Sequence, residues 1–308
     1  MIDRYKDQIA MSLKKKYINK FMRFVLAACT ATSMTSVGAA VAGESSSGSS
    51  LPVGGCASNL VFVVPGSANT ASFFPETVPH GAGTTGIAYR LNATPGVSAR
   101  MIPFNSAWPV GVVSYSDSYA MGLDKAMGII AREAQACPSA RISLFGYSEG
   151  ADIAAGVVEA INAHRGPVGP ERFGSAALMA NPSRGFNGAL AWGSASPGEA
   201  LRPVKDYGVL AERVLEICNA GDVVCDTDHV APTMNAMNTP VLQDSALLRG
   251  QVAWDKVVEW LGSAGPATLP AMVAETPGML MGWAVHGSYL MPGDGLDAGE
   301  SFLRAHFV

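Results

Sequence analysis

The feature that most constrains the fold is a serine between two glycines, Ser148 in the pentapeptide G-Y-S-E-G at residues 146–150. A short apolar run at 142–145 precedes it and predicts a buried strand, and a helix is predicted at 149–163. A turn between such a strand and helix is so tight that side chains at both glycine positions would collide with them. This context distinguishes the motif from a chance occurrence in a chain with 34 glycines, and it places Ser148 at the carboxyl edge of a sheet.

Short apolar strands and helices alternate through the middle of the chain. Further strands are predicted at residues 59–64, 100–104, 176–179 and 214–217, and a long helix at 116–136. Such alternation is typical of a mostly parallel sheet with helices on both faces. Because 48% of the residues are hydrophobic and only 15% are charged, the chain can bury a large core. We therefore predict a three-layer α/β fold.

Beyond Cys225 the pattern changes from alternating strands and helices to helices without a clear strand. Residues 245–261 predict a helix, and residues 298–307 predict a final one. The segment between them is rich in Met, Pro and Gly at residues 270–281. We expect residues 227–285 to form a helical insertion or lid.

Residues 1–42 are expected to be an export signal. A basic segment at 14–23 is followed by an apolar stretch at 24–41 and by Ala40-Val41-Ala42, a small-x-small cleavage site. One alternative is an uncleaved membrane anchor, but the many Thr, Ser and Gly residues of this stretch are unfavourable in a spanning helix. The other is a lipoprotein modified at Cys29, but the apolar segment before that cysteine is very short. A Gly/Ser-rich linker is predicted at 43–55 and the folded domain at 56–308, so we expect a secreted or cell-envelope protein.

Four cysteines remain after the predicted signal, an even number in a chain bound for an oxidising compartment. Four cysteines allow three pairings. Cys218 and Cys225 are close in sequence, so a local bridge is the simplest, and Cys56 is then left to pair with Cys137. Zinc would require C-x-x-C-like spacing or paired histidines, which the sequence lacks, so no metal and no other cofactor are expected.

A serine nucleophile needs a general base and an acid that orients the base. In hydrolases with a G-x-S-x-G turn these follow the serine in the order Asp or Glu, then His. Asp222 follows the strand at 214–217 within a short loop, and Asp226 and Asp228 are alternatives. The histidines that come after these acids are His229, His286 and His306.

In combination these segments resemble the cutinase family. Residues 146–151 resemble its nucleophile turn, and the loop from Cys218 to Cys225 resembles its second disulfide loop, which carries the catalytic aspartate at the position of Asp222. H-G-S-Y at 286–289 resembles the family's H-x-x-Y around the catalytic histidine, and Cys56 and Cys137 fall where its first disulfide lies. From Cys56 onward the resemblance implies an α/β-hydrolase with the triad Ser148, Asp222 and His286.

The resemblance also implies an oxyanion hole. Residues 65–67, P-G-S, resemble the family's R-G-S, so Ser67 is assigned as one donor through its N–H and hydroxyl, and the N–H of Glu149 as the other. Glu149 departs from the family, which usually carries Gln there. An ionised carboxylate beside an oxyanion is unfavourable, so Glu149 is expected to point away or to pair with a cation.

A second departure is the long segment between Asp222 and His286, where compact cutinases have a short one. His229 is closer to the disulfide but lacks the tyrosine pattern, which favours His286. The longer form is similar to cutinase-like enzymes of mycolic-acid bacteria, including trehalose dimycolate hydrolases, and to phage mycolyl-arabinogalactan esterases.

The features together predict a secreted serine esterase that acts on lipid esters such as envelope trehalose mycolates. An acyltransferase with the same acyl-enzyme and a non-catalytic envelope-binding protein are the alternatives. The net charge of −4, without a basic run outside the N-terminus, argues against nucleic acid as a partner. The expected partners are a lipid or glycolipid ester and, at the periphery, envelope lipids, and the chain is expected to be a monomer.

Overall fold

The structure is a computed structural model that describes residues 56–106, 113–196, 200–227, 230, 232–233, 235–236, 243–245, 251–263, 268–290 and 295–308. The predicted export signal and linker, together with Asp228 and His229, lie outside the described residues. In the described ranges, no helix has both the length and the apolar character that a membrane span needs.

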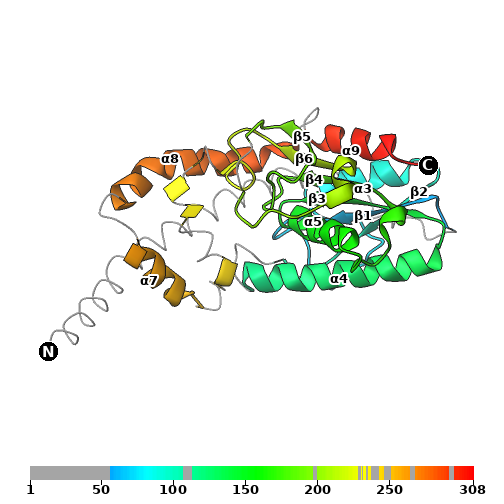
Figure 1. Ribbon diagram of the computed structural model, residues 1–308, viewed down its shortest axis with the longest axis horizontal. Helices are drawn as coiled ribbons and strands as arrows, with labels where there is room; N and C mark the ends of the chain where they lie inside the picture. Colours follow the sequence, from blue (N-terminus) through cyan, green and yellow to red (C-terminus); the bar gives the residue numbers. More distant parts are fainter. Residues whose placement is uncertain are drawn as a thin grey trace. The chain divides into compact units, whose positions relative to one another are not determined.

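A six-stranded sheet forms the centre of the folded domain (Figure 1), and all its neighbouring strands are parallel. Across the sheet the strands are β2 (Val97–Met101), β1 (Asn59–Val64), β3 (Arg141–Tyr147), β4 (Phe173–Met179), β6 (Val214–Cys218) and β5 (Leu190–Gly193). Every residue of β1 and β4 is buried, as expected for strands covered on both faces.

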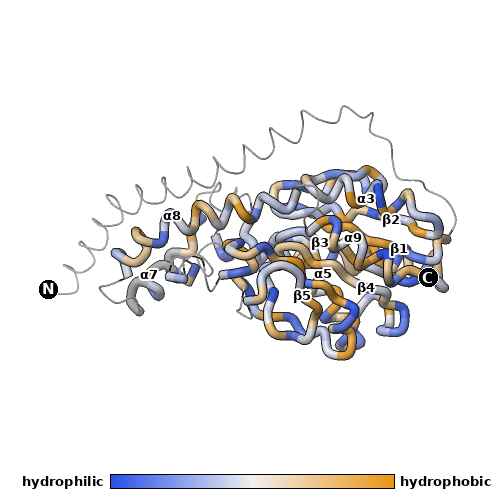
Figure 2. The backbone as a smooth tube through the Cα atoms, turned by 90° about the horizontal axis from the view of Figure 1, so that it is seen from above, coloured by the Kyte–Doolittle hydropathy of each residue, from blue (hydrophilic) through white to orange (hydrophobic). Residues whose placement is uncertain are grey.

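Helices cover both faces of this sheet (Figure 1). Helices α4 (Tyr115–Ala136) and α5 (Glu149–Asn162) lie on one face, and α3 (Thr84–Asn92) and α9 (Gly295–Ala305) lie on the other. Along β1 alternate side chains enter opposite cores, so Phe62 packs towards α5 whereas Val63 packs towards α3. Figure 2 shows hydrophobic residues concentrated in the strands and in α5. The predicted three-layer α/β fold is confirmed.

Some predicted elements differ from those observed. The strand predicted at 100–104 is β2, which begins at Val97 and ends at Met101, before Pro103, a residue that cannot donate to a strand ladder. Helix α3 and the short edge strand β5 were not predicted. Strand β5 is largely exposed and therefore lacks the continuous apolar run that marks the buried strands.

The segment after Cys225 contains two helices in its described part, α7 (Trp254–Ser263) and α8 (Thr268–His286). The predicted start of the first helix at Ser245 is wrong, because residues 251–253 are not helical and the Ser245 hydroxyl accepts a hydrogen bond from the N–H of Ala253. Helix α8 runs through the Met-, Pro- and Gly-rich stretch, with Pro277 inside it. Short 3-10 turns complete the described elements: η2 (Pro170–Arg172), η3 (Gly208–Arg213) and η6 (Ser288–Leu290).

The structure contains both disulfides at the pairings that the sequence favours. Cys56 bonds to Cys137, 81 residues away, and Cys218 bonds to Cys225, seven residues away. The first bridge joins the residue just ahead of β1 to the end of α4, and the second closes the loop after β6.

Removing the long-range disulfide is expected to destabilise the domain more than removing the short one. The entropy that a cross-link over 81 residues removes from the unfolded chain stabilises the fold by about 4.5 kcal/mol, whereas a cross-link over seven residues contributes about 2–3 kcal/mol. The double variants Cys56→Ser/Cys137→Ser and Cys218→Ser/Cys225→Ser can be compared by urea denaturation. The opposite order of stabilities would show that loop entropy is not the dominant contribution.

Candidate active site

Ser148 occupies the sharp turn between β3 and α5, with φ 55° and ψ −124°. A Cβ atom at Gly146 would lie 2.5 Å from the carbonyl oxygen of Gly150, and one at Gly150 would lie 2.2 Å from the carbonyl oxygen of Val64. Any side chain at either position would therefore force the strand, the helix or the end of β1 apart. The two glycines permit a turn in which the serine backbone takes a conformation rarely seen for a residue with a side chain.

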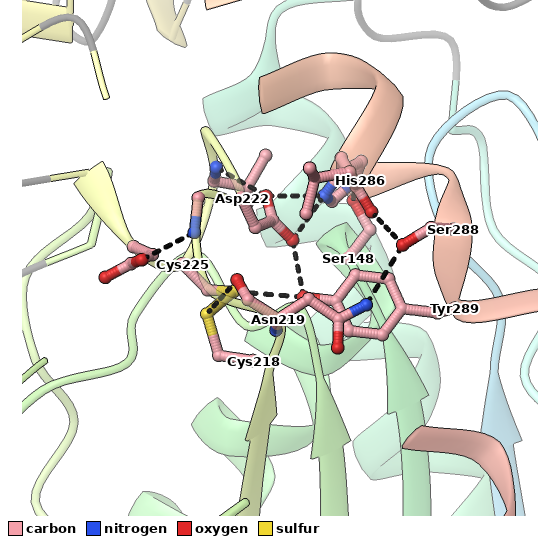
Figure 3. Close-up of polar contacts among 12 residues, drawn as sticks. Ser148, Cys218, Asn219, Asp222, Cys225, His286, Ser288 and Tyr289 are labelled. Carbon is pink, nitrogen blue, oxygen red and sulfur yellow. Dashed lines mark hydrogen bonds and ion pairs between the residues drawn. A yellow bond between two sulfur atoms is a disulfide. The ribbon is translucent and has the colours of Figure 1, made fainter. Parts of the chain in front are cut away.

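Three side chains from distant segments meet at this turn (Figure 3). The Oγ atom of Ser148 lies 3.0 Å from Nε2 of His286, and Nδ1 of His286 lies 3.0 and 3.1 Å from the two carboxylate oxygens of Asp222. A carboxylate facing Nδ1 favours the tautomer with its proton on Nδ1, which leaves Nε2 free to accept the Ser148 proton. All three residues are buried, so water competes little with these contacts.

The loop closed by the second disulfide holds Asp222. Oδ1 of Asp222 accepts a hydrogen bond from the N–H of Val224 at 2.7 Å, and Oδ2 accepts one from the hydroxyl of Tyr289 at 2.6 Å. The alternative acid Asp226 accepts instead from the N–H of Gly221 and from the hydroxyl of Ser194. Asp226 therefore stabilises the loop that presents Asp222, and Asp222 is the carboxylate that faces the histidine.

His286 is the last residue of α8 and is brought to Ser148 by the docking of that helix. A Cβ at Gly282 would lie 2.8 Å from Val230 and 2.9 Å from the Cβ of Val223, so glycine is needed for the helix to approach the Asp222 loop. The backbone oxygen of His286 accepts a hydrogen bond from the hydroxyl of Tyr147 at 2.7 Å. The Tyr147 ring also stacks on the imidazole at a centroid distance of 5.6 Å.

Tyr289 belongs to the H-x-x-Y motif, which by itself assigns the tyrosine no role. In the structure its hydroxyl donates to Asp222 and accepts from the N–H of Asn219 at 2.8 Å, which ties η6 to the disulfide loop (Figure 3). Burial and the neighbouring Asp222 carboxylate raise the pKa of Tyr289, which keeps the hydroxyl protonated as a donor. In the sequence, the position of Tyr289 three residues after His286 is the signal that could have indicated this role.

Tyr289→Phe is expected to lower kcat on a p-nitrophenyl ester about tenfold, with little change in KM. The variant leaves the buried Asp222 oxygen with one donor fewer and the Asn219 N–H without this acceptor, a loss of about 1–3 kcal/mol. Ser288→Ala is the matched control, since that hydroxyl contacts Asn219 and not the carboxylate. Equal kcat values for Tyr289→Phe and the wild type would contradict a positioning role.

Ser67, in the loop after β1, lies beside the nucleophile. A Cβ added to the preceding Gly66 would be 3.3 Å from the Cβ of Ser148. The Ser67 hydroxyl donates to Oε2 of Glu149 at 2.6 Å. The N–H of Glu149 opens helix α5, where the first N–H groups have no partner within the helix. The two assigned oxyanion donors therefore flank Ser148.

Of the two predicted arrangements for Glu149, pairing with a cation is not observed among the described residues. The side chain is fully buried, and its carboxyl binds the Ser67 hydroxyl, while the nearby Arg202 pairs with Asp152 at 2.8 Å. Burial raises the pKa of Glu149 to about 7, opposed by the hydroxyls of Ser118 and Ser67. Loss of hydration on burial, which the sequence does not reveal, favours the neutral form of this carboxyl.

The arrangement supplies a candidate nucleophile, a base and an orienting acid. In the described part of the chain, no group of three or more His, Cys, Asp or Glu side chains is placed to hold a metal ion. His306, an alternative candidate for the general base, forms a hydrogen bond with the carbonyl of Phe302 near the C-terminus. The set Ser148, His286 and Asp222 can therefore carry out acyl transfer by covalent catalysis.

Comparison with known proteins places these features in one family. The Cutinase family model matches residues 75–240, more than half of the chain. The carboxylesterase Culp1 of Mycobacterium tuberculosis (strain ATCC 25618 / H37Rv) is 29% identical over 146 residues, 47% of this chain and 62% of the relative. The same figures hold for Culp1 of Mycobacterium bovis, so the chain spans about 62% of the length of these relatives.

Among solved structures, lysin B from Mycobacteriophage D29 is similar in fold, with a TM-score of 0.52 and 16% identity over 80% of this chain and 99% of that one. At this identity the similarity concerns the fold alone. The family match, which includes both Ser148 and Asp222, and the parallel sheet with its serine turn agree with one another. The chain belongs to the cutinase family.

Proposed function

We propose that this protein is a serine esterase that hydrolyses carboxylic esters of lipids. The observation that carries the proposal is the unbroken chain of contacts from Ser148 through His286 to Asp222, at 3.0 Å for each link. Membership of the cutinase family and the similarity to a carboxylesterase support it. The burial of all three groups supports it further, since a hydrogen-bonded nucleophile and base shielded from water suit acyl transfer.

In the proposed mechanism His286 takes the proton of Ser148 while Oγ attacks the ester carbonyl. Asp222 orients the imidazole and stabilises its charged form. The N–H groups of Glu149 and Ser67 stabilise the oxyanion of the tetrahedral intermediate. The alcohol leaves with the proton from His286, and water then attacks the acyl-enzyme by the reverse sequence of proton transfers. No step requires a metal or organic cofactor.

We propose lipid esters, with envelope glycolipids such as trehalose mycolates as the specific candidates, as the substrates. Large apolar side chains are exposed on α8, where Val273 is 73% exposed and Met281 is 66% exposed, and in the loop after β1, where Phe73 is 80% exposed. Exposed apolar groups of this size suit contact with acyl chains or with a lipid surface. The predicted export signal and the two disulfides support a secreted or envelope location.

An ester panel tests this function. Wild-type protein and Ser148→Ala are given p-nitrophenyl esters of increasing acyl length and trehalose mycolates, and products are identified by mass spectrometry. We expect wild type to release free acid, and to prefer long acyl chains. Transfer of the acyl group to added trehalose would instead identify an acyltransferase. Failure of Ser148 to react with a fluorophosphonate probe would favour a non-catalytic binding protein.

A further inference from the structure

The carboxyl of Glu149 and the hydroxyl of Ser67 share a hydrogen bond beside the proposed oxyanion site. We propose that the protonation state of Glu149 decides whether Ser67 can donate its hydroxyl proton to the oxyanion, so that the enzyme is most active when this carboxyl is neutral. Glu149 is then a positioning residue that acts through Ser67. The inference rests on the proposed esterase function and adds a regulatory role for one of its residues.

The geometry places both groups next to the nucleophile. Ser67 Oγ is 2.6 Å from Oε2 of Glu149, and Glu149 is the residue that follows Ser148. The loop before Ser67 passes so close to Ser148 that a Cβ on Gly66 would be 3.3 Å from the Ser148 Cβ. The shared hydrogen bond therefore lies within reach of the atoms that would surround a substrate carbonyl.

The protonation state of Glu149 determines how many protons the two groups share. An ionised carboxylate only accepts, so Ser67 must give its single hydroxyl proton to Glu149 and present lone pairs to the substrate. A neutral carboxyl carries its own O–H, which can donate to Ser67 Oγ. The Ser67 proton is then free to turn towards the oxyanion. One proton enters from solvent and no covalent bond other than this O–H is formed.

The surroundings of Glu149 favour the neutral form. On the same helix Asp152 lies nearby, and its charge is already balanced by Arg202 at 2.8 Å and by the hydroxyl of Tyr115 at 2.7 Å. Tyr115, on α4, has a pKa raised well above its ordinary value by burial, so it adds no charge near Glu149. Arg202 thus neutralises Asp152 and not Glu149, although its charge lowers the pKa of Glu149 slightly.

The second carboxyl oxygen supports the same conclusion. Among the described residues, Oε1 of Glu149 is buried without a hydrogen-bond partner. The hydroxyl of Ser118, on α4, is close enough to lower the pKa of Glu149, but it donates its proton to the carbonyl of Asn105 at 2.8 Å. A buried carboxylate oxygen without a donor is costly when charged, whereas a protonated one is tolerated. With a pKa of about 7, Glu149 changes between its neutral and its ionised form near neutral pH.

The test is the pH dependence of kcat/KM on p-nitrophenyl butyrate, which reports the free enzyme. We expect the profile of the wild type to have an alkaline limb. The alkaline limb should fall about tenfold, centred near pH 7, as Glu149 ionises. In Glu149→Gln the amide can donate to Ser67 at every pH, so the alkaline limb should disappear and the rate should reach a plateau.

Glu216→Gln is the matched control. Glu216 is a second buried glutamate whose pKa burial raises to about 7, but it binds Tyr207 and Asn181, with no contact to Ser67. Its variant should keep the alkaline limb. Loss of the limb in both variants, or its presence in Glu149→Gln, would overturn the inference, as would a wild-type profile without an alkaline limb.

Ser67→Ala gives an independent measurement should Glu149→Gln fail to fold. It should lower the rate about tenfold and abolish the alkaline limb, because without the Ser67 hydroxyl the ionisation of Glu149 has no donor to redirect. An alkaline limb that persists in Ser67→Ala would count against the inference. Ser148→Ala, assayed in parallel, separates the two claims: if it is inactive while Glu149→Gln matches wild type, only the role of Glu149 fails. If it retains wild-type activity, the esterase proposal itself fails.

Discussion

Ser148→Ala is expected to reduce kcat on p-nitrophenyl esters by roughly 10⁵- to 10⁶-fold. The variant removes the Oγ atom that lies 3.0 Å from Nε2 of His286 and would form the acyl-enzyme. The backbone of the turn should persist, because the N–H of Ser148 bonds to the carbonyl of Met179 and alanine retains that N–H. Steady-state kinetics and covalent labelling by a fluorophosphonate probe both measure the loss.

Ser175→Ala is the matched control for the serine substitution. Ser175 is also fully buried, on β4, and its hydroxyl has no hydrogen-bond partner among the described residues. Removing this hydroxyl should leave kcat within about twofold of wild type, because the substitution deletes a polar group without breaking a hydrogen bond. Equal losses in the two variants would mean that disturbance of the core, and not loss of the nucleophile, explains the effect.

The second large effect is expected for Asp222→Asn, which should lower kcat by about 10³- to 10⁴-fold. Nδ1 of His286, the N–H of Val224 and the hydroxyl of Tyr289 all donate to the two carboxylate oxygens. An amide offers one oxygen only, so a donor must face its NH₂ group or the imidazole must change tautomer. In either case Nε2 is no longer poised to accept the Ser148 proton.

Asp226→Asn distinguishes loss of this charge from disturbance of the loop. Asp226 lies in the same segment and accepts from Gly221 and Ser194 without facing His286. We expect kcat to fall at most about tenfold. If the Asp226 variant lost as much activity as the Asp222 variant under conditions where both stay folded, the orienting role of Asp222 would be refuted. Circular dichroism and urea denaturation establish that both are folded.

The parts of the fold that were predicted well are those with a strong local signal. The strand predicted at 59–64 is β1 without change, because a continuous apolar run between turn residues has few ways to be buried except as a central parallel strand. The helix predicted at 116–136 differs from α4 by one residue, and Ser114 caps it by accepting from the N–H of Asp117.

Elements were missed where the local signal was weak or misleading. Strand β5 is an exposed edge strand, and it exists because β6 offers a free edge. Helix α8 contains Pro277, which normally ends a helix, yet it continues to His286. Its close contact with the Asp222 loop at Gly282 stabilises it, and no such contact can be read from the neighbouring sequence.

For the site around Ser148, the sequence by itself determined the tight turn, through Gly146 and Gly150, and the chain order of serine, acid and histidine. Local geometry suffices at Gly146, because an added Cβ would meet atoms of Gly150 and Ala151, whereas at Gly150 the collision is with the end of β1. The tertiary structure alone decided which acid faces His286, the support from Tyr289, and the burial of Glu149 against Ser67. These depend on desolvation and hydrogen bonding between segments far apart in the chain, and neither quantity is encoded in any single stretch of residues.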